Sequence, residues 1–233
     1  MSDKQQIEPI ARIRTDFPTK FGIPRQAGLA AELKGKIVFE PAYRVDEALR
    51  GLEGFSHIWL IWGFSENEGH EWTPTVRPPR LGGNTRMGVF ATRSPFRPNG
   101  LGLSCVRVLS LQKEEGIGTT ILVAGADMVD GTPIYDIKPY LPYCDSIPDA
   151  TGGFAPDAGR VLEVELPPEL EEKVPREKRT ALRSVLSCDP RPRYQDDPER
   201  VYGMGFGGME IRFRVDGERL IVTEIEENPE SGN

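Results

Sequence analysis

Residues 57–62 read His57-Ile58-Trp59-Leu60-Ile61-Trp62, a continuous apolar run that predicts a β-strand buried on both faces. On either side of this run, further strands are expected over residues 7–14, 36–42, 87–92, 103–111 and 119–126, which are rich in β-branched residues. The only helix expected in this part is one or two turns at Val45–Leu49. At least six strands within residues 1–140 predict a mainly β fold, either a barrel or a sandwich.

Glycine and proline are abundant throughout, with 25 and 21 copies among 233 residues. Both residues break helix interiors, which argues against a helical bundle or a coiled coil. The hydrophobic content of 38% is nevertheless enough to fill a core, so the chain is expected to fold.

The composition changes near Pro148–Pro156, where we place a linker. Beyond it, the pattern predicts a strand near residues 162–166, a helix over Pro175–Ser187 and a hairpin formed by residues 211–215 and 220–225. We therefore expect a β domain over residues 1–150 and a small α+β domain over residues 156–233.

Several classes of protein are disfavoured by what the sequence lacks. It contains no apolar run of about 20 residues, the length that a membrane span needs, and its first residues form no signal peptide. Its three cysteines are odd in number and far apart, which predicts reduced thiols rather than disulfides or a zinc site. We expect a cytoplasmic protein with no metal.

Charge is segregated along the chain. The net charge is −7, yet residues 77–107 contain six arginines and no Asp, Glu or Lys. Residues 216–233 are by contrast strongly acidic. A local basic segment favours an anionic partner more than the net charge opposes one. The simpler alternative, scattered surface arginines, would normally include acids between them.

Two familiar signatures do not fit their usual functions here. Gly203-Met-Gly205-Phe-Gly207-Gly208 matches G-x-G-x-x-G, but no βαβ unit surrounds it, so we expect a turn and not a dinucleotide site. His57 lies within the apolar run, where a core histidine is more probable than a base, and His70 lies in a polar loop. A serine–histidine hydrolase is therefore disfavoured.

Two segments are dense in functional residue types. Residues 73–107 combine arginines with Asn and Ser on a backbone stiffened by Pro and Gly, which suits anion binding. In residues 127–142, Asp130-Gly131 predicts a turn. Asp136 and Lys138 face one way if that stretch is extended. A turn braced by an ion pair explains the second segment equally well.

These segments closely resemble the TsaA/TrmO family of tRNA adenine-N6 methyltransferases, which use S-adenosylmethionine. The matching stretches are Phe21–Gln26, Gly51–Trp59, Arg77–Asn84, Gly88–Asn99, Asp130–Tyr140 and Asp189-Pro-Arg-Pro-Arg-Tyr194. The family usually has proline where this chain has Gly100 and often has His where it has Ser65. The resemblance covers nearly the whole chain.

The resemblance implies a single-sheet β-barrel at the N-terminus, a homodimer and a tRNA substrate methylated at the threonylcarbamoyl-modified adenosine 37. The cofactor contacts that it implies are Pro24, Arg25, Gln26, Ser65, Glu66, Arg93, Leu103, Asp127, Met128, Val129 and Asp130. We assign RNA phosphate contacts to Arg77, Arg80, Arg86 and Arg97. Asp130, Asp136 and Asn99 are the candidate catalytic residues.

The chemistry of methyl transfer requires little beyond orientation and exclusion of water, because a sulfonium is already an activated electrophile. The scarcity of histidine is therefore no obstacle. A noncatalytic β-barrel that binds RNA remains the alternative, as does a methyltransferase acting on a small molecule or a protein.

Overall fold

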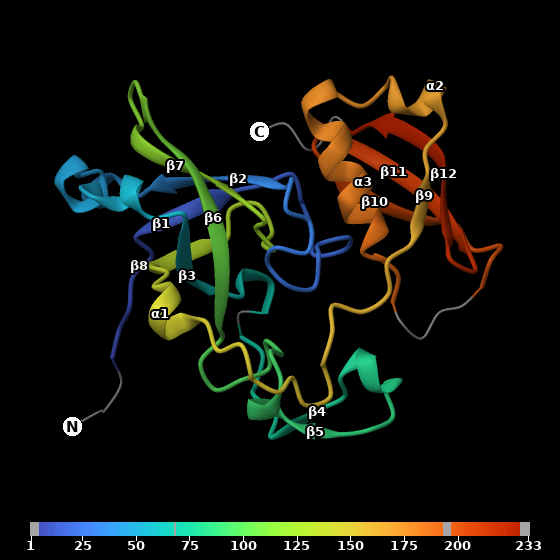
Figure 1. The fold of residues 1–233 in the computed structure, drawn as a ribbon, viewed down its shortest axis with the longest axis horizontal. Coiled ribbons are helices and arrows are strands. Elements are labelled where there is room, and N and C mark those ends of the chain that lie inside the picture. The colour runs from blue at the N-terminus through green and yellow to red at the C-terminus, as the bar shows by residue number, and fades with distance from the viewer. Residues whose placement is uncertain (1–4, 68, 193–196, 229–233) are drawn as a thin grey trace.

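The computed structural model describes residues 5–67, 69–192 and 197–228. Its N-terminal part is a closed barrel in which strands follow one another in the order β1-β2-β7-β6-β3-β8, and every neighbouring pair is antiparallel (Figure 1). The barrel strands are β1 (Ala11–Arg14), β2 (Lys34–Phe39), β3 (His57–Gly63), β6 (Leu101–Glu114), β7 (Gly118–Ala124) and β8 (Pro133–Pro139). The ring confirms the barrel and excludes the sandwich.

The barrel core comes from strand residues that alternate inward. In β3 the side chains of Ile58, Leu60 and Trp62 are buried, whereas Trp59 and Ile61 are half-buried on the outside. The expectation that this strand is buried on both faces was therefore wrong. In a closed sheet only one face of each strand can reach the interior.

Short 3₁₀ turns connect several barrel elements. The segment 87–92 was expected to be a strand, but only β5 (Met87–Gly88) is extended, and it pairs with β4 (Thr75–Val76). The Thr92 backbone N–H and hydroxyl both donate to the Val89 carbonyl, which closes the chain into a turn. The 3₁₀ turns are η1 (Pro41–Tyr43), η2 (Asp46–Leu49), η3 (Leu52–Gly54), η4 (Ser65–Asn67), η5 (Pro79–Leu81), η6 (Val89–Ala91) and η7 (Arg176–Lys178).

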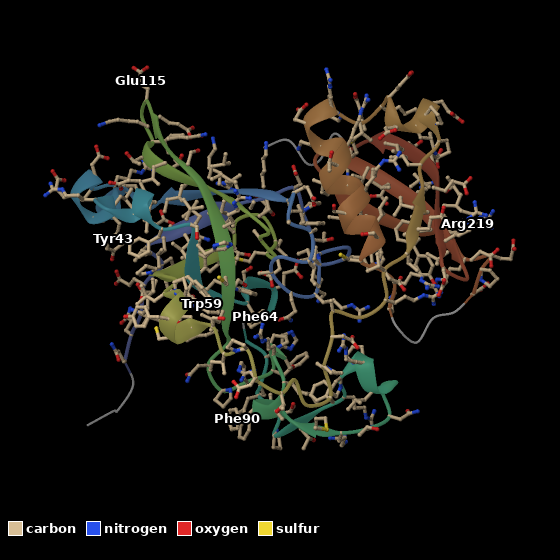
Figure 2. The ribbon with its side chains drawn as sticks, in the orientation of Figure 1. Tyr43, Trp59, Phe64, Phe90, Glu115 and Arg219 are labelled. Carbon is tan, nitrogen blue, oxygen red and sulfur yellow. The ribbon has the colours of Figure 1, made fainter. Side chains whose placement is uncertain are left out.

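Three connections of the barrel leave it at the same end. Strand directions alternate around the antiparallel ring, so the chain exits β1, β3 and β7 on one side. The connections are residues 15–33, 64–100 and 125–132. We call this end the loop mouth. The β6–β7 hairpin, with Glu115 at its tip, lies at the opposite end from Phe90 of the second connection (Figure 2).

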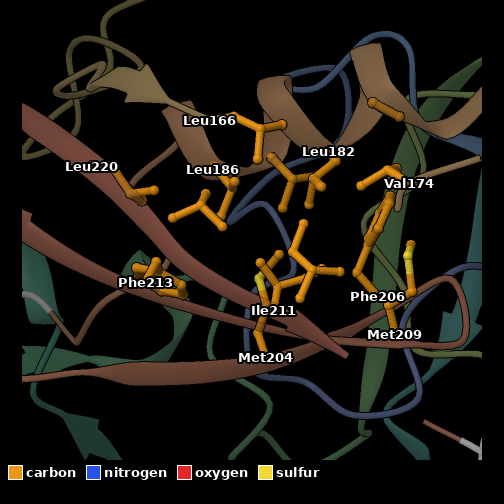
Figure 3. Packing of buried hydrophobic residues seen from close by; sticks show 14 of the residues in the cluster. Leu166, Val174, Leu182, Leu186, Met204, Phe206, Met209, Ile211, Phe213 and Leu220 are labelled. Carbon is orange, nitrogen blue, oxygen red and sulfur yellow. The ribbon is translucent and has the colours of Figure 1, made fainter. Parts of the chain in front are cut away.

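The C-terminal part is a four-stranded sheet in the order β10-β11-β12-β9, and only β9 runs parallel to its neighbour. Helix α3 covers it with a buried stripe of Ala181, Leu182, Val185 and Leu186 (Figure 3). The predicted helix over residues 175–187 thus corresponds to η7 and α3. The remaining elements are α1 (Pro142–Asp145), β9 (Glu163–Glu165), α2 (Pro168–Glu171), α3 (Arg179–Ser187), β10 (Tyr202–Phe206), β11 (Met209–Asp216) and β12 (Arg219–Glu227).

The glycine-rich pattern lies in this sheet and not at a nucleotide-binding helix. Residues up to Phe206 belong to strand β10, and only Gly207-Gly208 forms a turn, with both φ angles positive at 57° and 85°. The prediction of a turn was therefore wrong for the first part of the pattern and right for these two residues. A strand follows the turn, so the Rossmann geometry is absent here.

The second core lies between α3 and the C-terminal sheet, but it also contains residues from the first connection. Phe17, Ala30 and Leu33 are buried among the side chains of this core. Met204 and Phe206 of β10 belong to the same core and lie on the side of the sheet that faces it (Figure 3). Residues 15–33 therefore join the barrel to the C-terminal sheet. No helix in the described ranges is long and apolar enough to cross a membrane.

Barrel packing leads to a stability prediction at Gly102. A Cβ at this position would lie 2.3 Å from the ring of Trp62, which also donates from Nε1 to Ser104. We expect Gly102→Ala to lower the free energy of unfolding by about 1–3 kcal/mol, because the rigid ring must move. The measurement is urea unfolding at equilibrium.

The matched control is Gly100→Ala, where a Cβ would meet nothing within 4 Å. We expect it to change stability by less than about 0.5 kcal/mol. Equal stabilities of the two variants would contradict the packing argument.

Candidate active site

A half-buried carboxylate lies in the loop mouth. Asp127, in the third connection, accepts a hydrogen bond from the hydroxyl of Ser104 at 2.6 Å and another from the backbone N–H of Ala27. Ser104 in turn accepts from Trp62 Nε1 at 3.0 Å. Burial raises the pKa of Asp127, and the hydrogen bonds and the nearby Arg93 oppose that rise only in part. A hydrogen-bonded carboxylate whose pKa is raised in this way is typical of a functional site.

Two further predicted cofactor contacts meet beside it. The Arg93 guanidinium of the second connection donates to the side-chain oxygen of Gln26 in the first. The two residues before Gln26 are Pro24, which is buried, and Arg25, which donates to the backbone carbonyl of Arg191 at 3.0 Å. The structure therefore brings Gln26, Arg93 and Asp127 together from three separate connections. We call these three residues the mouth cluster.

Asp130 lies in the same connection, but its carboxylate is engaged with the backbone. It accepts from the Thr15 backbone N–H at 2.9 Å and from Arg14 Nη1 at 3.2 Å. Its own backbone N–H donates to Phe17 at 2.8 Å. These contacts fix the start of residues 15–33. The expected turn at Asp130-Gly131 is present, since Gly131 has a φ of 77°.

Met128 and Val129 contribute differently from Asp127. The Met128 side chain is buried in the barrel core, and its carbonyl accepts from the Thr15 hydroxyl. The Val129 carbonyl accepts from the backbone N–H and the hydroxyl of Thr132. Both residues thus support the connection through the core and the backbone.

Asp136 and Leu103 lie on the outer surface of the barrel. They pair with Ile61 of β3 from its two sides, Asp136 on β8 and Leu103 on β6. The adjacent Ser104 is buried, which separates this outer row from the mouth cluster. Asp136 forms an ion pair with Lys138 at 2.8 Å, so the expectation that both face one way is confirmed.

The remaining predicted residues lie on the second connection. Ser65 and Glu66 begin η4 directly after β3, and Glu66 lies 3.8 Å from Lys20 of the first connection. The Asn99 side chain is exposed, and its backbone carbonyl accepts from Leu101 at 2.7 Å. Residues 15–33 and 64–100 are thus close to one another at a second point.

The four arginines assigned to RNA differ in their surroundings. Arg80 donates to the carbonyl of Asp157 at 2.7 Å and pairs with its carboxylate, and Arg97 donates to two carbonyls of its own loop. Arg86 is exposed and donates to the Thr75 hydroxyl, while Arg77 is exposed beside β4. Arg77 and Arg86 therefore present the most accessible charge.

Sequence reasoning missed the partners that hold Asp127. Ser104 and Trp62 come from neighbouring strands, and Ala27 contributes only a backbone N–H. Ser104 does carry a signal, because it is a polar residue at an inward position of an alternating strand. Arg193 and Tyr194 of the Asp189–Tyr194 motif lie outside the described residues.

Comparisons with known proteins cover both parts of the chain. The family model of the tRNA-methyltransferase O N-terminal domain matches residues 12–146, and that of the TrmO C-terminal domain matches residues 160–228. The tRNA (adenine(37)-N6)-methyltransferase of Escherichia coli (strain K12) is 42% identical over 220 residues, covering 90% of this chain and 93% of that protein. The enzyme of the same name from Eikenella corrodens is 48% identical over 172 residues, covering 73% and 97%.

A solved structure gives the same result for the fold. The crystal structure of TrmO from Pseudomonas aeruginosa superposes with a TM-score of 0.78 at 30% sequence identity, covering 96% of this chain and 98% of that one. Similarity in sequence and in fold thus extends over both parts of the chain. The chain therefore belongs to the tRNA-methyltransferase O family and contains both of its domains.

Proposed function

We propose that the loop mouth binds S-adenosylmethionine and that the chain methylates N6 of adenosine 37 in tRNA. The chain is an S-adenosylmethionine-dependent tRNA methyltransferase, as its full-length similarity to enzymes of that activity indicates. The observation that carries the site is the mouth cluster, where Gln26, Arg93 and Asp127 meet from three connections. These residue types fit an amino-acid nucleoside.

The side chains of the mouth cluster complement the polar groups of such a cofactor. The planar Arg93 guanidinium suits a carboxylate, and Gln26 and Asp127 offer acceptors for amino or hydroxyl groups. The cofactor supplies a methyl group already activated by a sulfonium. The chain then needs to orient the adenine amine for in-line attack and to exclude water. Solvent can take the proton released by the amine, so no strong base is required.

We assign positions around this centre as follows. Four residues border the cofactor, namely Pro24, Arg25, Ser65 and Glu66. Asp130 acts indirectly, because its carboxylate accepts a hydrogen bond from the Thr15 backbone N–H and so fixes the start of residues 15–33. Asn99 is a candidate for orienting the adenine amine at the mouth of its own barrel, whereas Asp136, on the outer row with Leu103, is a candidate for doing so at the mouth of a second copy. We also propose that residues 1–150 and 156–233 are the two domains, with the cofactor held by the first.

The basic second connection is proposed to contact the tRNA backbone. Arg77 and Arg86 present exposed guanidinium groups, and Arg80 and Arg97 use only some of their five N–H donors in the contacts described above. A modified base in an anticodon loop is open to contact, unlike one inside an A-form helix. We propose the threonylcarbamoyl-modified adenosine as the substrate and the cytoplasm as the location.

A homodimer is proposed from the outer surface of β6. Leu101, Leu103 and Leu109 are all more than a third exposed on this strand, at 37%, 53% and 39%. Covering such a row would bury apolar area. A homodimer would also explain how Leu103 can contact a cofactor although it lies on the outside of its own barrel. The cofactor it contacts would be the one bound by the second copy.

Activity is tested with S-adenosylmethionine and two preparations of one tRNA, with and without threonylcarbamoyl at adenosine 37. We expect methyl transfer to the modified tRNA and none to the unmodified one, and Arg93→Ala to bind the cofactor more weakly in calorimetry. A chain that binds tRNA without binding S-adenosylmethionine would favour the noncatalytic alternative.

Asp127 gives a prediction for pH dependence. Because burial raises its pKa above 3.8, the stability that it contributes is present below pH 3.8 and is lost as pH rises through the folded-state pKa. Asparagine does not ionise, so Asp127→Asn should gain stability relative to wild type as pH rises from about 4 to 7. It should also bind S-adenosylmethionine more weakly.

Urea unfolding across this pH range and calorimetry measure the two effects. Asp149→Asn is the control, because Asp149 is exposed and loses little hydration on folding. If the stability difference between Asp127→Asn and wild type stays constant with pH, this would contradict a raised pKa of Asp127 in the folded state.

The RNA surface is tested by salt dependence. Arg77→Ala and Arg86→Ala should each weaken tRNA binding and reduce the slope of log K against log salt by about 0.7–0.9, as for one lost phosphate contact. Arg219→Ala is the control, since Arg219 pairs with Glu165 in the C-terminal sheet. Slopes identical to wild type for both variants would exclude a phosphate role.

A further inference from the structure

We propose that the C-terminal sheet positions the cofactor-binding segment of the barrel, with Lys178 and strand β10 as the positioning elements. This inference rests on the proposed function, because it concerns residues Phe21–Gln26 of the first connection. These residues have no regular secondary structure, so contacts on either side must fix their conformation. Fixing a binding loop in advance lowers the entropy lost when a ligand binds.

Apolar contacts hold the first connection against β10. The Phe17 ring is fully buried in the C-terminal core and meets Phe206 edge-on at 5.6 Å. Gly22 lies directly over Met204, with a φ of 92°, and a Cβ there would be 2.6 Å from the Met204 sulfur. This close approach is two residues before Pro24, the first of the proposed cofactor contacts.

Polar contacts from the C-terminal part hold the same connection on both sides of this point. Lys178 forms an ion pair with Asp16 that is only partly exposed, and the Gly207 backbone N–H donates to the Asp16 carbonyl at 2.7 Å. Farther along, Ser184 of α3 donates to Glu32 at 2.6 Å. The C-terminal part thus contacts residues 15–33 near their beginning, middle and end.

The opposite side of the segment contacts the loop mouth. Gln26 accepts from Arg93, the Ala27 backbone N–H donates to Asp127, and the Gly28 N–H donates to Gly125 at 2.9 Å. Gly22, which contacts Met204, is only four positions before Gln26 of the mouth cluster. A displacement of the segment by the C-terminal sheet is therefore expected to reach the cofactor contacts.

Two glycines on one face of β10 provide a matched test. A Cβ at Gly205 would lie 2.6 Å from Pro18 Cγ, and the proline ring moves only with its backbone. A Cβ at Gly203 would meet only the flexible end of Glu210. Gly205→Ala should therefore push the first connection, whereas Gly203→Ala should leave it in place.

We expect Gly205→Ala to weaken S-adenosylmethionine binding at least about fivefold in calorimetry, the lower end of typical coupling between sites. Its KM for the cofactor should rise in parallel, while kcat at saturating cofactor stays within about twofold, since binding and not the chemical step is changed. Gly203→Ala should match wild type. The Tm of both variants is measured to establish that they are folded.

A double-mutant cycle excludes a general loss of structure. Pro18→Ala removes the ring atom that the new Cβ would meet, so adding Gly205→Ala to it should have no further effect on cofactor affinity. A second test leaves β10 unchanged and alters the ion pair between Lys178 and Asp16. Lys178→Gln should weaken cofactor binding, and Lys178→Arg should retain wild-type binding. Arg219→Gln breaks an ion pair elsewhere in the sheet and should have no effect.

Equal cofactor affinities of folded Gly205→Ala and Gly203→Ala would overturn the positioning role. If Gly205→Ala fails to fold, an unchanged affinity in Lys178→Gln overturns it instead. A wild-type chain that does not bind S-adenosylmethionine would refute the proposed function itself, which distinguishes the two failures.

Discussion

Antiparallel pairing around a closed ring of six strands is the constraint on which the candidate active site depends. Because directions alternate around the ring, residues 15–33, 64–100 and 125–132 must all leave the barrel at one mouth. Residues separated by up to about a hundred positions in the chain can then meet across a few ångströms, as Ala27 and Asp127 do. Closure also pairs the edges of every strand, so it is the connections that present functional side chains.

The mouth cluster shows how a barrel can hold a charged group at its rim. Asp127 loses hydration there, and the hydroxyl of Ser104 and a backbone N–H replace it only in part. Trp62 donates a hydrogen bond to Ser104, and the absence of a side chain at Gly102 makes room for the Trp62 ring. A site that raises the pKa of its own carboxylate lowers stability locally, which is common where function sets the environment.

Much of the fold could be predicted from residue patterns. The apolar runs placed most barrel strands, and the C-terminal helix and hairpin were found from periodicity and turn residues. Two errors have different causes. The strand expected over residues 87–92 is mostly a turn, because the Thr92 hydroxyl and backbone N–H both donate to Val89. The pattern at Gly203 is mostly a strand, because its residues pair with β11, and local propensity does not encode such pairing.

Residue patterns alone established that the chain is mainly β, that its arginines are concentrated in one segment and that its motifs are those of one methyltransferase family. Which of those motif residues meet became clear from the folded chain. It brought Gln26, Arg93 and Asp127 together, engaged Asp130 with the backbone of Thr15 and placed Leu103 outside the barrel. It also buried Phe17 in the C-terminal core. The physical reason is that strand pairing and burial act between residues far apart in the chain, whereas periodicity and composition are local.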